Sequence, residues 1–229
     1  MINHQQIHWP IALSSAYQQQ LLAVGQQSRA FPKNGDLPGD GTLYYIHRGL
    51  VALRVYTLCG RSVITMIRGE GEWLTTYSGP MALSIHVEPL TDCQLMSFSA
   101  DKLDKLKQQQ LEHYKLLHGI SQSIQARWMQ AQLIGCFSAQ EQVAYLLLEL
   151  GRHFPRYQVP LSQKRLSELT GIARQRVNET CRALVAAGAI DSQHSLITLK
   201  RLAPFNEILR HSDLSSHNPL LLLGQHIPQ

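Results

Sequence analysis

The stretch "LSQKRLSELTGIARQRVNETCRALVAAGAI", residues Leu161–Ile190, predicts two short helices joined by a tight turn. Ser162 can cap the first helix, and Gly171 can adopt the left-handed backbone angles that such a turn needs. The second helix is expected from about Arg174 until Gly188 ends it. The segment "AIDSQHSLITL" that follows offers two short strands around a polar turn. Together these elements predict a helix-turn-helix followed by a β wing.

The second of these helices has one apolar side and one unusually polar side. Val177, Cys181 and Leu184 recur at helical spacing and are expected to be buried. The opposite side carries Arg174, Gln175, Asn178, Glu179 and Arg182. Such a face either contacts water, as most outer helix faces do, or contacts the edges of DNA bases.

Composition limits the class of protein. The chain has 229 residues, 44% of them hydrophobic, and a formal net charge of +5, which suits an anionic partner without requiring one. The four cysteines are far apart, with no CxxC pair and no zinc-like spacing, so we expect reduced thiols. No stretch reads as a signal peptide or a membrane span. We therefore expect a cytoplasmic protein that does not bind membranes.

Upstream of residue 100, short β-rich runs are separated by glycines and other turn residues, which favours a small antiparallel barrel or roll. The expected strands are Leu43–Ile46, Leu50–Thr57, Ser62–Ile67, Ala82–Val87 and Cys93–Phe98.

From about Ala100 the pattern becomes helical, with no proline until Pro155. Apolar side chains recur there at seven-residue and intermediate spacing, as in a coiled-coil seam. This stripe predicts dimerisation along about Leu103–Gly135, through Leu117, Ile120, Ile124, Trp128 and Ala131. An amphipathic helix packed on its own domain would show the same periodicity, so both interpretations stay open.

A capping box formed by Ser138 and Glu141 predicts the start of another helix and a domain boundary near Cys136. The expected organisation is a sensor β-roll over residues 1–100, a dimerisation helix over 101–135, a winged helix-turn-helix over 136–211 and a tail over 212–229. The tail has no interpretation from sequence.

The segment "TLYYIHRGLVAL" (Thr42–Leu53), the long helix and the Leu161–Ile190 stretch, in this order, resemble the CRP/FNR family over roughly residues 30–200. This family is named for the cyclic-AMP receptor protein and the fumarate and nitrate reduction regulator. The resemblance implies an α+β chain with an N-terminal antiparallel β-roll like a cyclic-nucleotide-binding domain, a dimerisation helix and a C-terminal winged helix-turn-helix. It further implies a homodimeric transcriptional regulator whose partners are double-stranded DNA and RNA polymerase.

In the family, the first positions of the recognition helix and the position one turn later touch base edges, and these match Arg174, Gln175 and Glu179. The prototype has arginine where this chain has Glu179. Ala173 stands where serine is common, which removes a helix cap. The DNA-binding residues that we predict are Ser162, Lys164, Arg165, Ala173, Arg174, Gln175, Arg176, Asn178, Glu179 and Arg182.

The sensor half departs from the family's cyclic-nucleotide binders, which hold the ribose with a Gly-Glu pair and the phosphate with an Arg-Ser or Arg-Thr pair. In "GEWLTTYSGPMALSIHVE", Thr75 and Thr76 stand in place of the first pair and Leu83 and Ser84 in place of the second. A buried phosphate without a cation would lose its strongest hydrogen bonds. Cyclic AMP is therefore not the expected effector. The candidate effector pocket comprises Glu72, Trp73, Leu74, Thr75, Thr76, Leu83 and Ser84.

Other members of the family that this chain resembles sense through iron chemistry. An iron-sulfur cluster needs several clustered thiolates, but no cysteine precedes Cys59. Haem stays open because His8, His47 and His86 are available as ligands, although a single histidine defines no ligand geometry. We predict no cofactor and no metal site; an unidentified small molecule, or no effector at all, are the other interpretations.

Enzymes and pure protein-interaction modules are two other classes of function. We find no nucleophile motif, no metalloprotease motif and no phosphate loop, so no catalytic residue is assigned and an enzyme is not expected. A protein-interaction module with a degenerate helix-turn-helix stays open, since the missing cap at Ala173 would fit it.

Overall fold

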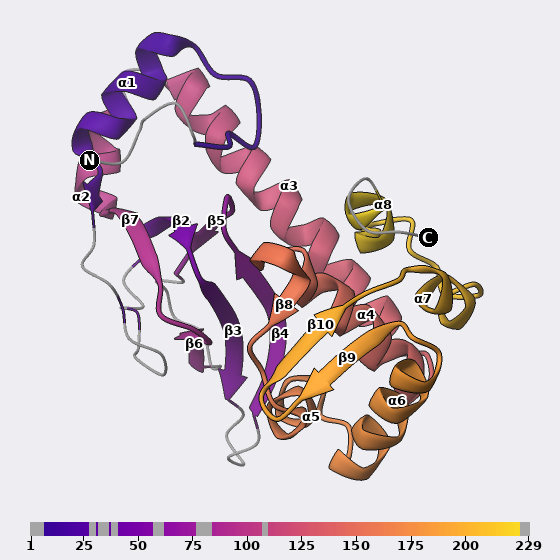
Figure 1. Ribbon diagram of the computed structural model, residues 1–229. Coiled ribbons are helices and arrows are strands. Elements are labelled where there is room, and N and C mark those ends of the chain that lie inside the picture. Colours follow the sequence, from indigo (N-terminus) through magenta and orange to yellow (C-terminus); the bar gives the residue numbers. More distant parts are fainter. Residues whose placement is uncertain are drawn as a thin grey trace. The chain divides into compact units, whose positions relative to one another are not determined.

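The computed structural model describes residues 7–27, 31, 37, 41–56, 62–76, 84–106 and 110–224 (Figure 1). The chain divides into two compact units, Met1–Ala126 and Arg127–Gln229. The division falls inside helix α3, Gln110–Ile134. The last turns of this helix therefore belong to the same unit as the helix-turn-helix.

The first unit is built on two antiparallel sheets, as predicted, with strand orders β1-β7-β2-β5 and β4-β3-β6. The strands have the β-branched and aromatic composition that suits a pleated surface. At the turn between β2 and β3, Gly49 has φ +101°, and a Cβ there would lie 2.6 Å from the carbonyl oxygen of Asp92. Only glycine fits this close approach. The strands are β1 (Gln26–Gln27), β2 (Leu43–Arg48), β3 (Leu50–Tyr56), β4 (Ser62–Gly69), β5 (Trp73–Thr75), β6 (Ser84–Pro89) and β7 (Gln94–Phe98).

An N-terminal helix that the sequence did not predict, α1 (Ser15–Val24), packs on the β1-β7-β2-β5 sheet within this unit. Its buried Tyr17 and Leu21 join Trp73 and Phe98 in one hydrophobic cluster. A second cluster fills the interior between the strands with Tyr44, Ile46, Val51, Leu74, Val87, Cys93 and Leu95. The side chains of the strands themselves therefore occupy much of the roll's interior.

The long helix predicted over residues 101–135 consists of two elements among the described residues. A short helix, α2, spans Ala100–Asp104, and α3 begins at Gln110. On α3, Leu116 and Ile120 are buried in the first unit's core. After α3, Ser138 caps α4 (Ala139–Gly151) in a complete capping box with Glu141, as predicted.

The second unit contains the predicted helix-turn-helix and wing. A third strand, β8, which the sequence did not predict, joins the wing hairpin in the antiparallel order β8-β10-β9. Val143, Leu147 and Leu150 on α4 and Phe205 on α7 are fully buried and form its core. The remaining elements are β8 (Gln158–Val159), α5 (Gln163–Thr170), α6 (Arg174–Ala186), β9 (Ile190–Gln193), β10 (Leu196–Leu199), α7 (Ala203–Ile208) and α8 (Pro219–Leu223).

Among the helices described, none combines the length and the apolar character needed to cross a bilayer.

Candidate nucleic-acid interface

The turn between α5 and α6 is fixed by local hydrogen bonds. Ser162 caps α5 by accepting from the amide of Arg165 at 3.2 Å, and Gly171 ends the helix in the left-handed conformation with φ +71°. The hydroxyl of Ser167 donates to the carbonyl of Ile172 at 2.6 Å, and Thr170 accepts from the amide of Ile172 at 3.2 Å. These bonds hold α6 at a defined angle to α5. The predicted roles of Ser162 as a cap and of Gly171 as the turn are confirmed.

The apolar side of α6 is buried, as predicted. Val177, Cys181 and Leu184 are at most 1% exposed. Burial raises the pKa of the Cys181 thiol to about 11, so this cysteine is a neutral packing residue rather than a reactive thiolate.

The opposite side of α6 presents its polar side chains to solvent. Arg174, Gln175, Arg176, Glu179 and Arg182 are exposed, and Asn178 is half-buried. Two contacts order this face: the Gln175 amide donates to Glu179 at 3.1 Å, and Arg176 lies 3.9 Å from the same carboxylate. The predicted base readers thus share one accessible helix face.

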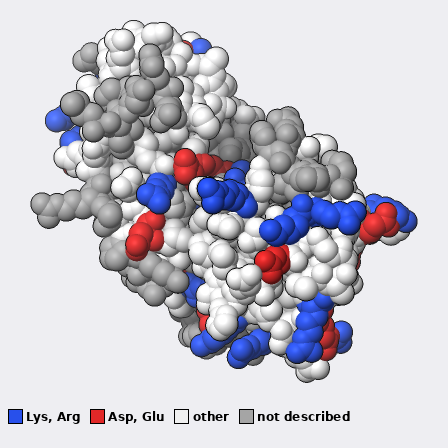
Figure 2. Space-filling view, viewed as in Figure 1, with Lys and Arg blue, Asp and Glu red and all other residues white. Residues whose placement is uncertain are grey.

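Ala173 is the N-cap of α6 and makes no side-chain capping bond. The first amides of α6 are therefore without a side-chain cap, at the end of the helix where the dipole favours an anion. On α5, Lys164 is exposed, while Arg165 forms an ion pair of 2.7 Å with Glu168. Figure 2 shows Lys and Arg side chains gathered over α5 and α6, with acidic side chains between them.

The wing hairpin lies next to α6 in the fold. Its turn includes His194, an exposed residue with a positive φ of 43°. The wing is anchored by Lys200, whose amide donates to the carbonyl of Ala189 at 2.8 Å. The sequence predicts the hairpin, but no local pattern marks these two basic residues.

The candidate effector residues are largely structural where they are described. Trp73 and Leu74 are buried, and the Trp73 indole donates to the carbonyl of His8 at 2.8 Å. Thr76 is also buried and donates to the carbonyl of Thr42 at 3.3 Å, whereas Thr75 is exposed. Leu83 lies outside the described residues, and of Ser84 only the backbone, which opens β6, is described.

Glu72 lies close to a buried cation, Arg68, that the sequence did not indicate. Its carboxylate accepts from the amide of Gly69 at 2.9 Å and lies 3.7 Å from Arg68. Arg68 on β4 is only 2% exposed and donates to the Ser123 hydroxyl on α3 at 3.1 Å. This contact ties α3 to the sheet of the first unit. The one feature of the sequence that could have pointed to this buried cation is an arginine at the end of an apolar strand.

Two of the three histidines considered as haem ligands make ring contacts. His47 packs edge-on against Tyr45 at 4.9 Å and His86 against Tyr56 at 5.0 Å between ring centroids. Burial lowers the pKa of His47 below its ordinary value. Among the described residues, no three His, Cys, Asp or Glu side chains are grouped as a metal site would require.

The predicted dimerisation residues lie on two sides of α3. Leu117 and Trp128 are 41% and 48% exposed, and Tyr114, on the same helical face, is 66% exposed. Ile120 is buried in the first unit, Ile124 packs against that unit's core, and Ala131 is half-buried. The exposed part of the stripe therefore comprises Tyr114, Leu117 and Trp128.

Comparison with known proteins gives a family match for the second unit. Residues 141–207 match the family model of the Crp-like helix-turn-helix domain. No curated protein sequence matches the chain significantly.

Solved structures extend the likeness to most of the chain. FixK2 from Bradyrhizobium japonicum superimposes with a TM-score of 0.69 at 19% identity, over 81% of this chain and 97% of FixK2. The global regulator CLP of Xanthomonas campestris, described as responsive to c-di-GMP, gives 0.59 at 20% identity, over 81% of this chain and 99% of CLP. A CRP-family transcriptional regulator from Thermus thermophilus gives 0.60 at 16% identity, over 81% and 98% of the two chains.

At these identities the structural matches establish the fold, while the family match establishes the domain that carries α5 and α6. Residues 141–207 belong to the Crp-like helix-turn-helix domain family, and the chain as a whole has the fold of the CRP/FNR transcriptional regulators.

Proposed function

We propose that this chain is a sequence-specific DNA-binding transcriptional regulator that acts as a homodimer and catalyses no reaction. One observation carries the proposal: α6 follows a fixed turn in a Crp-like domain and presents an exposed face of arginine, glutamine and glutamate. A helix of this kind fits the major groove, where each base pair has its own pattern of donors and acceptors.

Three side chains at the start of α6 have the chemistry to read bases. Arg174 can donate two hydrogen bonds to a guanine, Gln175 can pair with an adenine, and Glu179 can accept from the amino group of a cytosine. The half-site should therefore differ from that of the cyclic-AMP receptor protein at the position that Glu179 meets.

The backbone contacts would come from the residues around this face. Lys164, Arg165 and Arg176 can pair with phosphates, and the uncapped amides that follow Ala173 can bind one as well. Ser162, Asn178 and Arg182 complete the interface that we predict. Phosphate contacts set affinity and register, whereas base contacts set sequence choice.

Homodimerisation is proposed through the exposed face of α3, with Leu117 and Trp128 at its centre and Ile124 and Ala131 at its margin. Ile120 faces the protomer's own core and has little surface left for a partner. A twofold dimer would bind a pseudo-palindrome with half-site centres about 34–36 Å apart. RNA polymerase is the further partner expected for a regulator of this kind.

We propose that cyclic AMP does not control this regulator. Trp73, Leu74 and Thr76 are packed or bonded within the unit, and no arginine stands at Leu83 to meet a phosphate. Haem or another small molecule is the alternative form of control. Titration calorimetry with cyclic AMP should give no saturable heat, whereas micromolar binding that alters DNA affinity would contradict this part of the proposal.

Selection of bound sequences from random duplexes tests the proposed function directly. The purified chain should enrich a pseudo-palindrome, and its affinity should fall steeply as salt is raised. A variant with Arg174, Gln175 and Glu179 all changed to alanine serves as the control and should enrich no sequence. Absence of salt-dependent duplex binding by the wild type would favour the protein-interaction module instead.

A further inference from the structure

The segment that follows α7 packs into the second unit through a buried amide. Gln130, near the end of α3, is 0% exposed. Its side-chain nitrogen donates to the carbonyl of Asp213 at 2.7 Å, and its side-chain oxygen accepts from the amides of Ser216 and His217 at 3.2 and 3.1 Å. A buried side-chain amide that lacks hydrogen-bond partners lowers the stability of the folded state. Gln130 therefore depends on the C-terminal segment for its hydrogen bonds.

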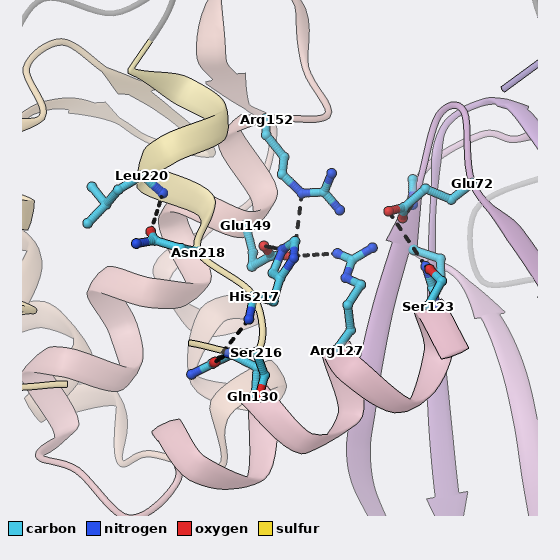
Figure 3. Close-up of polar contacts among 12 residues, drawn as sticks. Glu72, Ser123, Arg127, Gln130, Glu149, Arg152, Ser216, His217, Asn218 and Leu220 are labelled. Atoms are coloured by element: carbon cyan, nitrogen blue, oxygen red, sulfur yellow. Dashed lines mark hydrogen bonds and ion pairs between the residues drawn. The ribbon is translucent and has the colours of Figure 1, made fainter. Parts of the chain in front are cut away.

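A buried carboxylate joins the same segment to two helices. Glu149 on α4 pairs with Arg127 on α3, lies 2.5 Å from the His217 imidazole and lies 3.5 Å from Arg152 (Figure 3). The Arg127 and Glu149 side chains are 7% and 8% exposed. The Glu149 carboxylate thus balances the charges of Arg127 and Arg152, and it also contacts His217 of the C-terminal segment.

The two ends of the segment are also anchored. At its start, the Ser212 hydroxyl donates to Glu141 at 2.9 Å, the same carboxylate that completes the capping box of α4. At its end, Asn218 caps α8 by accepting from the amide of Leu220 at 3.0 Å, and Pro219 and Leu223 of α8 are buried. Helix α8 packs on α4. Residues 212–223 therefore form a continuous connection from the start of α4 to the end of α3.

We propose that residues 212–223, the C-terminal strap, hold the last turns of α3 against α4, and that docking of the strap sets how firmly α3 is joined to the helix-turn-helix domain. The position of the strap supports this role. Helix α3 begins in the first unit and ends in the second, and the contacts of Arg127 and Gln130 begin at the division between the units. Releasing the strap removes every bond that Gln130 makes to Asp213, Ser216 and His217.

The strap therefore acts on the end of α3 within the second unit rather than on the base-reading face. With the strap released, residues 127–134 lose their partners from the C-terminal segment, whereas α5 and α6 keep their own core of Leu166, Val177 and Leu184. The expected consequences are a less firmly held α3 end and weaker DNA binding for all sequences alike. This last step rests on the proposed function.

Hydrogen exchange measured by mass spectrometry on the full chain tests the strap without reference to DNA. Gln130→Ala, and a chain that ends at His211, should speed amide exchange of residues 127–134 at least tenfold, while α5 and α6 change less than twofold. Gln132→Ala is the matched control, because Gln132 is an exposed glutamine two residues along the same helix. A synthetic peptide of residues 212–224 added to the shortened chain should restore protection, and a scrambled peptide should not.

Unchanged exchange of residues 127–134 in the Gln130→Ala variant, or equal acceleration throughout the second unit, would overturn the proposal. The point variant decides the matter if the shortened chain fails to fold. In DNA binding, the Gln130→Ala variant should lose affinity severalfold with unchanged base preference. A wild-type chain that binds no duplex would contradict the proposed function, whereas the exchange result would still decide the role of the strap.

Discussion

The side-chain amide of Gln175 donates a hydrogen bond of 3.1 Å to the carboxylate of Glu179, one turn further along α6. Both residues are exposed on the face that we propose for base reading. An i,i+4 pair of this kind stabilises a helix by only about 0.2–0.5 kcal/mol. The bond therefore biases the orientation of the Gln175 amide before it meets DNA and links the two residues that we propose as base readers.

We therefore expect Glu179→Ala to change base preference at two positions, its own and the neighbouring position that Gln175 reads. Gln175→Ala should change only one. Selection from random duplexes with each variant and with the double variant measures how strongly the two side chains are coupled in base preference. Each wrong base is expected to cost about 1–3 kcal/mol of binding free energy. Strictly additive effects confined to separate positions would show that the two side chains read DNA independently.

Arg174 and Lys164 should separate base reading from phosphate binding. Arg174→Ala should cost about 1–3 kcal/mol on the selected site and relax one base position, whereas Lys164→Ala should weaken binding to every sequence alike and reduce the salt dependence. Fluorescence anisotropy on the selected and an unrelated duplex measures both. If the two variants weakened both duplexes equally, the base-reading role of Arg174 would be wrong.

The helix-turn-helix could be predicted because its signals are local. Ser162, Gly171 and the spacing of Val177 and Cys181 each act within a few residues, and the structure places them as the sequence indicated. Helix α1 was missed because its two buried residues, Tyr17 and Leu21, are separated by three consecutive glutamines. A single pair four residues apart is too little periodicity to predict a helix.

The strap was beyond sequence analysis for a different reason. Glu149 meets Arg127 and His217, which are 22 and 68 residues away in the chain. Pairing of charges at such distances depends on tertiary packing, which no local spacing reports. The same holds for Arg68 and Ser123, which are 55 residues apart. The predicted stripe on α3 was ambiguous because core and dimer faces share one periodicity, and Ile120 turned out to face the core.

Ala173→Ser should stabilise the second unit. Ala173 has φ −54° and ψ 135° and lacks a capping bond, so a serine hydroxyl there could accept from an amide of the first turn of α6. The expected gain is about 1 kcal/mol in the free energy of unfolding, measured by urea denaturation. Ala187→Ser, at the other end of α6, is the control and should give no such gain, because a hydroxyl there finds no unpaired amide.

Leu117→Glu should weaken the homodimer and, with it, binding to a palindromic site. Leu117 is 41% exposed, so a charge there costs the monomer little but must be desolvated in the dimer. Analytical ultracentrifugation should show at least a tenfold higher dissociation constant. Ile124→Glu is a less clean test, because Ile124 also packs against the first unit's core. Gln140→Glu, at an exposed site on α4, is the control; an unaltered dimer in the Leu117 variant would refute this interface.

Glu149 should make stability depend on acid pH. Burial alone would raise the pKa of Glu149, but the charge of Arg127, the hydrogen bond from His217 and the charge of Arg152 outweigh it and hold the pKa well below its ordinary value. A carboxyl whose pKa is lowered on folding contributes its full stability above its unfolded pKa, about 4.3, and loses it as the pH falls through the folded pKa.

Glu149→Gln should therefore lower the free energy of unfolding by about 3–5 kcal/mol at pH 7, since it leaves the buried Arg127 uncompensated. The difference between wild type and variant should shrink as the pH falls below about 4.3. Urea denaturation across pH 3–7 measures this difference, and Glu207→Gln, which changes a carboxylate in the exposed pair with Arg210, is the control with a much smaller expected effect. A difference that stayed constant down to pH 3 would mean that the Glu149 charge does not hold the strap and the two helices together.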